Sequence, residues 1–225
     1  MISLISDNYQ LIQVMTRFGI NVGFGDKTVM EVCRDGGVDC TTFLAVVNFI
    51  ANGQRISPDE TPISLPSLMK YLKSSHSYFL EYCLPSIRRK LIDAINISTT
   101  DVSFLILKLF DETRDEIKRH MDYEERTVFD YIDNIERYAE MPEFHISIYS
   151  DNHEHVSGKL SELKKLIIKY CPGSLDTNSL NDALYSLYAC EEDLLSHCRV
   201  EDCLLVPAIL SIEQRIRECS AERKE

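Results

Sequence analysis

The sequence lacks several features that mark particular classes of protein. No apolar run approaches the roughly 20 residues that a membrane-spanning helix needs. The first residues contain neither a basic region nor a long apolar stretch, and Asp7 follows almost at once, so we expect no secretory signal peptide. The alternation of apolar and polar residues that is typical of half-buried strands never extends over a useful length. These absences favour an all-α protein with no membrane partner.

Positive charge is scarce. The chain has 24 Lys and Arg residues against 36 Asp and Glu residues, which gives a formal net charge of −12. Proteins that bind DNA or RNA through the phosphate backbone carry a basic surface. We therefore expect no nucleic-acid partner, whereas an acidic surface is compatible with solubility and with cation binding. The charge leaves the oligomeric state open.

The eight cysteines are scattered and form no Cys-x-x-Cys pair. In a chain of this length without an export signal, such cysteines are typical of reduced thiols rather than of a disulfide framework. We expect a cytoplasmic protein in which most cysteines are small core residues.

Glycine and proline are also few, with eight and seven residues, and they cluster at boundaries. The segment 53–64 is rich in Pro and small polar residues and is predicted to be a linker. Before it, residues 1–52 are predicted to form a small helical domain, an appendage with short helices at about 7–18, 28–35 and 40–51. Residues 65–220 form the larger predicted domain.

That larger region contains four long patterns of apolar residues with helical spacing, at about 65–94, 102–138, 143–170 and 180–218. Four long helices with short connections predict an up-down-up-down four-helix bundle. Pro85 and Pro207 interrupt the first and fourth patterns, and we expect a bend near each because proline removes a helical hydrogen bond.

The histidines are the most informative residues. One histidine on each predicted long helix falls into a regular scheme: His76 and His120 are 44 residues apart, and so are His153 and His197. The midpoint of each pair lies in a predicted turn. Because antiparallel helices place mirror-related residues side by side, each helical hairpin is expected to bring its two histidines to one level.

Two of these histidines are followed four residues later by a glutamate, in the pairs His120–Glu124 and His197–Glu201. Residues four apart share a helix face, so each pair directs an imidazole and a carboxylate to the same point. Four imidazoles and two carboxylates are a ligand set for two metal ions, with the glutamates placed to bridge them. Iron or manganese suits these donors, and zinc is also possible. The Glu-x-x-His signature of ferritin-type sites is absent.

Several alternatives remain open. His153 competes with His155, since residues two apart on a helix point in nearly opposite directions, and the repeated spacing of 44 favours His153. Glu124 competes with Glu125, and Glu201 with Asp202. A metal-free helical interaction module is a further possibility. Residues that could support or line the centre, or be ordinary surface or core residues, are Glu116, Asp193, Tyr123, Tyr149 and Tyr188.

The four histidines with two His-x-x-x-Glu pairs resemble the hemerythrin-like HHE domain. The whole chain resembles the Repair of Iron Centres (YtfE/ScdA) family, in which a short helical domain precedes the bundle; the segment from Arg17 to Cys33 is similar to that domain. The resemblance implies an oxo- or hydroxo-bridged di-iron centre, repair of damaged iron–sulfur proteins, and a role in nitrosative and oxidative stress. The implied metal ligands are His76, His120, Glu124, His153, His197 and Glu201.

The chain departs from that family at the cysteine pair of the first domain, which falls on Gly23 and Phe24 here. Thiol chemistry attributed to that pair cannot operate in this protein, and Cys33 is expected to be a small buried residue. Oxygen-carrying hemerythrins also differ, because they use five histidines and His-x-x-x-His pairs, which this chain lacks. Two functions are therefore expected as alternatives: iron–sulfur cluster repair, or sensing or binding of O₂ or NO at the same centre.

Overall fold

The structure is a computed structural model, and it describes residues 1–54, 63–95, 101–138, 153–171 and 176–222, without the side chains of 136–138, 153–157 and 220–222. Helices account for nearly all of these ranges, and no strand occurs in them. The prediction of an all-α fold is confirmed. Among the described helices, none combines the length and the apolar character that crossing a membrane requires.

The chain divides into two compact units that do not follow chain order. The first unit contains Met1–Ser75, Val128–Ser150 and His197–Glu225, and the second contains His76–Thr127 and Asp151–Ser196. The N-terminal segment is thus grouped with segments that come much later in the sequence. The division into 1–52, 53–64 and 65–220 stays a prediction.

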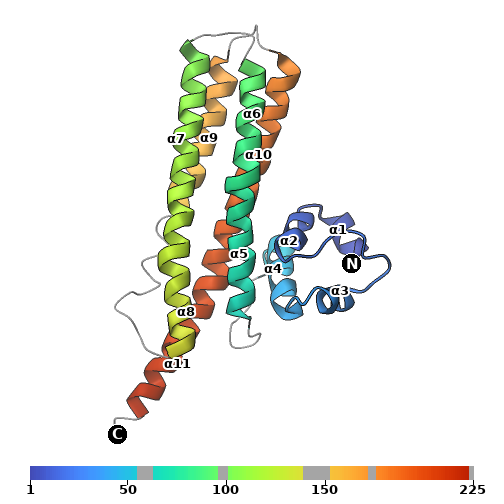
Figure 1. Ribbon diagram of the computed structural model, residues 1–225, viewed down its shortest axis with the longest axis vertical. Coiled ribbons are helices and arrows are strands. Elements are labelled where there is room, and N and C mark those ends of the chain that lie inside the picture. Colours follow the sequence, from blue (N-terminus) through green and yellow to red (C-terminus); the bar gives the residue numbers. More distant parts are fainter. Residues whose placement is uncertain (55–62, 96–100, 139–152, 172–175, 223–225) are drawn as a thin grey trace. The chain divides into compact units, whose positions relative to one another are not determined.

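The first unit begins with four short helices, α1 (Ile2–Asp7), α2 (Leu11–Arg17), α3 (Val29–Asp35) and α4 (Cys40–Asn52), which gather into one group in Figure 1. Residues that typically cap helices stand at several of their ends. The Thr28 side chain and Glu31 form a capping box at the start of α3, and Asp39 accepts a hydrogen bond from the backbone N–H of Thr42 at the start of α4. Gly53 ends α4 in the left-handed conformation, with φ of 67°. The three short helices expected from the sequence are present, and α1 is additional.

These helices share one apolar core with the rest of the first unit. The core joins α2 and α4 to α5 (Leu65–Ser77), α8 (Phe129–Tyr138) and α11 (Val206–Glu222). The ring of Phe18 stacks on the ring of Tyr71 with 4.8 Å between centroids, and the Arg199 guanidinium lies 5.4 Å from the centroid of Phe49. The N-terminal helices are therefore built into a core that they share with the other segments of the first unit.

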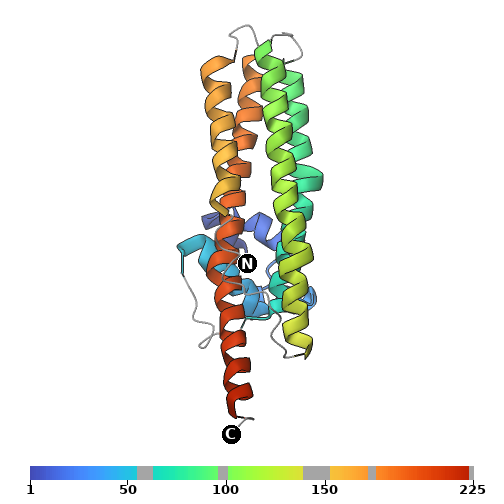
Figure 2. The ribbon, with the colours of Figure 1, turned by 90° about the vertical axis from the view of Figure 1, so that its left-hand side faces the viewer.

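The second unit contains α6 (Leu84–Ile95), α7 (Asp101–Tyr123), α9 (His153–Tyr170) and α10 (Thr177–Val200, as far as Ser196). Figures 1 and 2 show these four helices running side by side, as the predicted bundle requires. Their inward faces form a second apolar core that includes Leu91, Phe110 and Leu187. The apolar residues at helical spacing thus bury the stripe that each helix presents to its neighbours.

Ion pairs join each helix of this bundle to its neighbours. Each pair joins two helices, and together they link α6 to α7, α7 to α9, α9 to α10, and α10 to α6. The four pairs, in that order, are Arg88–Asp111, Glu116–Lys159, Lys164–Glu191 and Asp182–Lys90. The Arg88–Asp111 pair has two hydrogen bonds of 2.8 and 2.9 Å, the bidentate geometry that fixes orientation best.

In the described residues, three of the long helices contain a π-helical segment: η1 (Tyr78–Cys83), η2 (Glu124–Val128) and η5 (Glu201–Leu205). Pro85 is the second residue of α6, which follows η1, and Pro207 is the second residue of α11, which follows η5. The carbonyl four residues before each proline therefore lies in a π segment. The wider turn accommodates the proline ring and its missing N–H. Where we expected a bend near each proline, the structure has a π segment. The helix expected from 143 is described only from His153.

Candidate metal centre

Two histidines of the second unit face the same buried carboxylate. His76 Nε2 lies 3.2 Å from Glu124 Oε2, and His120 Nε2 lies 3.0 Å from Glu124 Oε1. The His76 and Glu124 side chains are 1% and 0% exposed, and His120 is 8% exposed. Each carboxylate oxygen of Glu124 therefore faces a different imidazole nitrogen in a site that excludes water.

These distances fit metal ligands. Two ligands that lie about 2.1 Å from one ion and at right angles to each other are about 3 Å apart. The two separations at Glu124 match that value, one for each oxygen of the carboxylate. A carboxylate whose oxygens face two imidazoles has the arrangement needed to bridge two ions. The donors are suited to iron, manganese or zinc.

Glu125 supports His76 from the other side of its ring. Its Oε1 lies 2.9 Å from His76 Nδ1 and accepts the hydrogen bond of that nitrogen. The proton is thereby held on Nδ1, and Nε2 is left with the lone pair that a metal ion would take. From the sequence alone, Glu125 is only an alternative to Glu124 as a metal ligand. The structure gives the two residues different partners on the same imidazole, an interaction that crosses between helices and leaves no spacing signal.

The first unit holds the other His-x-x-x-Glu pair. His197 Nε2 lies 3.3 Å from Glu201 Oε1, and the two side chains are 1% and 0% exposed. The i, i+4 spacing brings the imidazole and carboxylate together here, as it does at His120 and Glu124. The core residues Val200, Leu204 and Leu205 surround this turn with apolar groups.

Both glutamates begin a π-helical segment, Glu124 in η2 and Glu201 in η5. Single π turns inside α-helices are often found at functional sites, because the wider turn redirects the side chains at its start. Within the described part of the chain, the side chains that could contribute to holding a metal ion are His76 and Glu124 in the second unit, and His197 and Glu201 in the first.

The remaining predicted residues have different outcomes. His153 is the first residue of α9, but its side chain and that of His155 lie outside the described residues, as does Tyr149. His153 as a ligand therefore stays a prediction. Tyr188 is half exposed, and the Lys164 ammonium lies 3.7 Å from its ring centroid, so this tyrosine contacts a charged neighbour.

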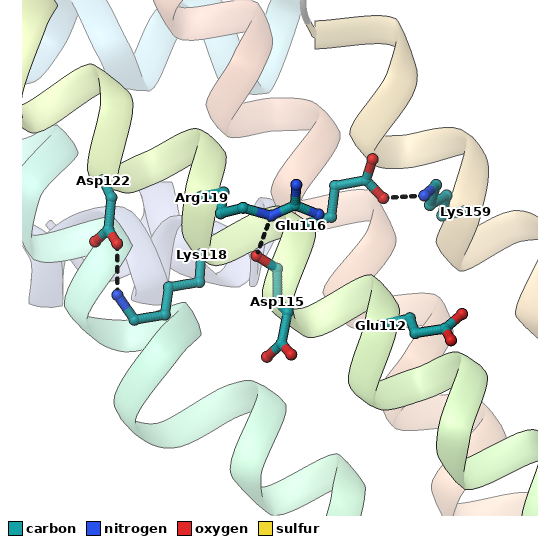
Figure 3. Close-up of a pocket in the computed structure, with 7 residues that line it drawn as sticks. All are labelled: Glu112, Asp115, Glu116, Lys118, Arg119, Asp122 and Lys159. Atoms are coloured by element: carbon teal, nitrogen blue, oxygen red, sulfur yellow. Dashed lines mark hydrogen bonds and ion pairs between the residues drawn. The ribbon is translucent and has the colours of Figure 1, made fainter.

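Glu116, a possible supporting residue of His120, is paired with Lys159 in an open pocket between α7 and α9. Figure 3 shows these two side chains facing each other across the pocket, while Lys118 and Arg119 interact with groups of α7 itself. Four acidic and three basic side chains line the pocket, so the charges nearly compensate one another. The alternative interpretation of Glu116 as a surface helix charge fits this contact.

In a comparison with protein families, residues 67–209 match the Hemerythrin HHE cation binding domain. Searches of curated proteins and of solved structures gave no match. The matched range covers well over half of the chain and contains every predicted ligand, including the buried His76, Glu124, His197 and Glu201. The protein therefore belongs to the hemerythrin HHE family of cation-binding proteins.

Proposed function

We propose that this protein is a non-haem di-iron protein of the iron–sulfur cluster repair type that acts under nitrosative and oxidative stress. The observation that carries the proposal is the buried Glu124 carboxylate, whose two oxygens face His76 and His120 at 3.2 and 3.0 Å. A carboxylate in that position is suited to join two ions.

The ligand set assigned by the proposal takes one histidine from each long helix and both buried glutamates. His76, His120 and Glu124 contribute from the second unit, and His197 and Glu201 contribute from the first, with His153 as the sixth ligand. Divalent ions bound between the buried carboxylates and imidazoles would add positive charge that stabilises the ionised glutamates. The bound irons would supply redox chemistry and coordination positions for small molecules, and the protein residues hold them apart from bulk water.

A second function rests on a different observation. The N-terminal helices share a core with Val200, Leu204 and Leu205, which flank Glu201 on both sides. A movement of Glu201 on binding of O₂ or NO would therefore be transmitted through this core to the N-terminal helices, as a sensor requires. The absence of the family's cysteine pair at Gly23 and Phe24 favours the same alternative.

The first test measures metal content. The full chain is loaded anaerobically with Fe(II), desalted, and analysed by elemental mass spectrometry. We expect about two irons per chain, and after exposure to air a near-ultraviolet band from a bridged di-ferric pair. Glu124→Gln should lose at least one iron, whereas Glu112→Gln, an exposed position on α7, should lose none. A chain without stoichiometric metal would overturn the di-iron proposal.

The second test separates repair from sensing. A dehydratase whose iron–sulfur cluster has been damaged by NO is incubated with the iron-loaded protein, and recovery of dehydratase activity is measured. Recovery that is lost in Glu124→Gln supports repair. Reversible binding of NO without recovery of the dehydratase supports the sensor function and excludes the repair function.

A further inference from the structure

Helix α10 presents a stripe of large apolar side chains on its outer face. Cys190 and Leu194 of this helix are buried in the core of the second unit, whereas Tyr185, Tyr188 and Leu195 are 75%, 48% and 43% exposed. The exposed residues are separated by three and by seven positions, so they lie in line along one side of the helix. Large exposed apolar side chains that share one face of a soluble protein mark a surface that binds another protein.

Helix α9 widens this apolar face. Its Lys164 is paired with Glu191, and the Lys164 ammonium lies 3.7 Å from the ring centroid of Tyr188, so α9 and α10 lie side by side at this level, as Figure 2 shows. Ile168 follows Lys164 by one helical turn and is 61% exposed. Since α9 and α10 run antiparallel, Ile168 lies at nearly the height of Tyr188. The apolar face therefore spans both helices.

The order of residues along α10 makes this stripe complementary to itself. Tyr185 and Leu195 lie five residues on either side of Cys190, and Tyr188 and Glu192 lie two residues on either side of it. Antiparallel helices place mirror-related residues side by side. When two copies of α10 pack antiparallel at the level of Cys190, Tyr185 of each copy faces Leu195 of the other. The same symmetry places Tyr188 of each copy opposite Glu192 of the other.

The charges favour this antiparallel arrangement. The Tyr188 hydroxyl is a hydrogen-bond donor, and the exposed Glu192 of the other copy supplies a carboxylate acceptor. The Lys164 ammonium beside the Tyr188 ring adds positive charge at the point that the carboxylate approaches. In a parallel pair, the two Glu192 side chains would instead face each other and repel. The charge pattern thus selects one of the two possible orientations.

We propose that the protein forms a two-fold symmetric dimer through the outer face of α10, with Ile168 of α9 beside it. The same surface of each copy is used, so the assembly closes after two copies. Tyrosine is enriched at protein interfaces, where it supplies a large contact area at a small cost in side-chain entropy. Because the shared face is narrow, we expect a reversible dimer with a dissociation constant in the micromolar range.

Sedimentation equilibrium of the full chain, from low micromolar to several hundred micromolar concentration, tests the dimer. Leu195→Glu places a carboxylate in the apolar contact and should raise the dissociation constant at least about tenfold. Leu210→Glu is the matched control, because Leu210 lies in α11 and is also 43% exposed, and it should leave the constant unchanged. Circular dichroism verifies that both variants are folded. A monomer at every concentration, or an equal loss in both variants, would overturn the proposal.

A mixing experiment tests the antiparallel register. Tyr185→Lys alone should also weaken the dimer, since the introduced lysine faces Leu195 at both ends. In an equimolar mixture of Tyr185→Lys and Leu195→Glu chains, the two introduced charges face each other at one end, and an unchanged Tyr185–Leu195 contact remains at the other. We expect the mixture to associate more tightly than either variant alone, and replacing Leu195→Glu by Leu210→Glu should remove that gain. A mixture that associates no better than the separate variants would contradict the proposed pairing.

Discussion

At the scale of single residues, Glu124 defines the candidate centre. Its carboxylate is fully buried, and its two oxygens lie 3.2 and 3.0 Å from the imidazole nitrogens of His76 and His120. Leaving a carboxylate in the interior without compensation costs several kcal/mol, which is why such groups are normally paired or bound to metal ions. The interaction of each oxygen with a different histidine is consistent with the metal-binding character of the family.

Glu125 is expected to act through His76. Replacing it by Gln weakens the hydrogen bond at Nδ1 that orients the ring, and residues in this position typically change metal affinity about 10–100-fold. We expect Glu125→Gln to lower the affinity for Fe(II) or Zn(II), measured by competition with a chelator, within that range. Glu112→Gln serves as the matched control on the same helix. Equal affinities for the two variants would show that the 2.9 Å contact does not orient the ligand.

The Lys164–Glu191 pair should behave as a buried ion pair. Lys164 is 5% exposed, and its ammonium contacts both Glu191 and the ring of Tyr188. Lys164→Met leaves a carboxylate without its partner, which costs about 3 kcal/mol in the free energy of unfolding. Adding Glu191→Leu should recover most of that loss. The four proteins of this cycle are compared by urea denaturation, and additive effects of the two substitutions would contradict the coupling.

At the scale of helices and turns, periodicity predicts the extent of the long helices well because their apolar residues recur at three and four. It predicts the His120–Glu124 and His197–Glu201 contacts for the same reason. It does not predict the π segments, because a single wide turn hardly changes an apolar pattern spread over many turns. Pro85 and Pro207 were the available signals for two of them. The His76–Glu125 contact was missed because it joins residues from separate helices.

The ion pair between α6 and α7 makes stability depend on pH. The hydrogen bond and charge of Arg88 hold the pKa of Asp111 below its ordinary value of 3.8. A carboxyl whose pKa is lowered by folding stabilises the fold above its unfolded pKa, and that stabilisation is lost as the pH falls through the lowered value.

We therefore expect Arg88→Gln to lower the free energy of unfolding by up to about 1 kcal/mol at pH 7, a modest effect because both side chains are partly exposed. The difference from the parent protein should shrink as the pH falls below about 4. Chemical denaturation at pH 7, 5 and 3 measures it. A difference that stays constant down to pH 3 would assign the loss to packing rather than to charge.

At the scale of the whole molecule, the N-terminal helices share a core with segments that lie much later in the chain. The polar segment 53–64 is typical of a linker between independent parts, and composition cannot show which buried faces meet in space. Leu11, Phe43 and Phe49 pack in one core with residues of α5 and α11. Such contacts join segments that are distant in the chain, so the local sequence pattern does not predict them.

Removing residues 1–52 should therefore destabilise the remaining chain. Leu68, Leu72 and Leu204 would lose part of their cover, and exposing one such side chain costs about 1.5–3 kcal/mol. We expect the shortened chain to be insoluble or to unfold at least about 10 °C lower, because several such losses approach the whole stability of a typical domain. Thermal unfolding followed by circular dichroism measures this.

The matched control for that experiment removes only residues 2–7. Helix α1 contains no buried residue, so its loss should change the unfolding temperature little. If the chain without residues 1–52 unfolded at the same temperature as the parent, the shared core would contribute nothing to stability.

The π segment at Glu201 also determines where this helix tolerates a change in length. A π turn closes its hydrogen bond over one residue more than an α turn, so it absorbs an extra residue while the flanking α-helices keep their faces. Deleting Cys203 should restore a regular α-helix that preserves the contact of Glu213 with Tyr131 but redirects Glu201. Deleting a residue within α11 before Glu213 would instead rotate everything beyond it by about 100°. Deleting one residue in the π segment would thus keep the helix packing and impair the metal centre. Deleting one residue in α11 would disrupt the helix packing itself.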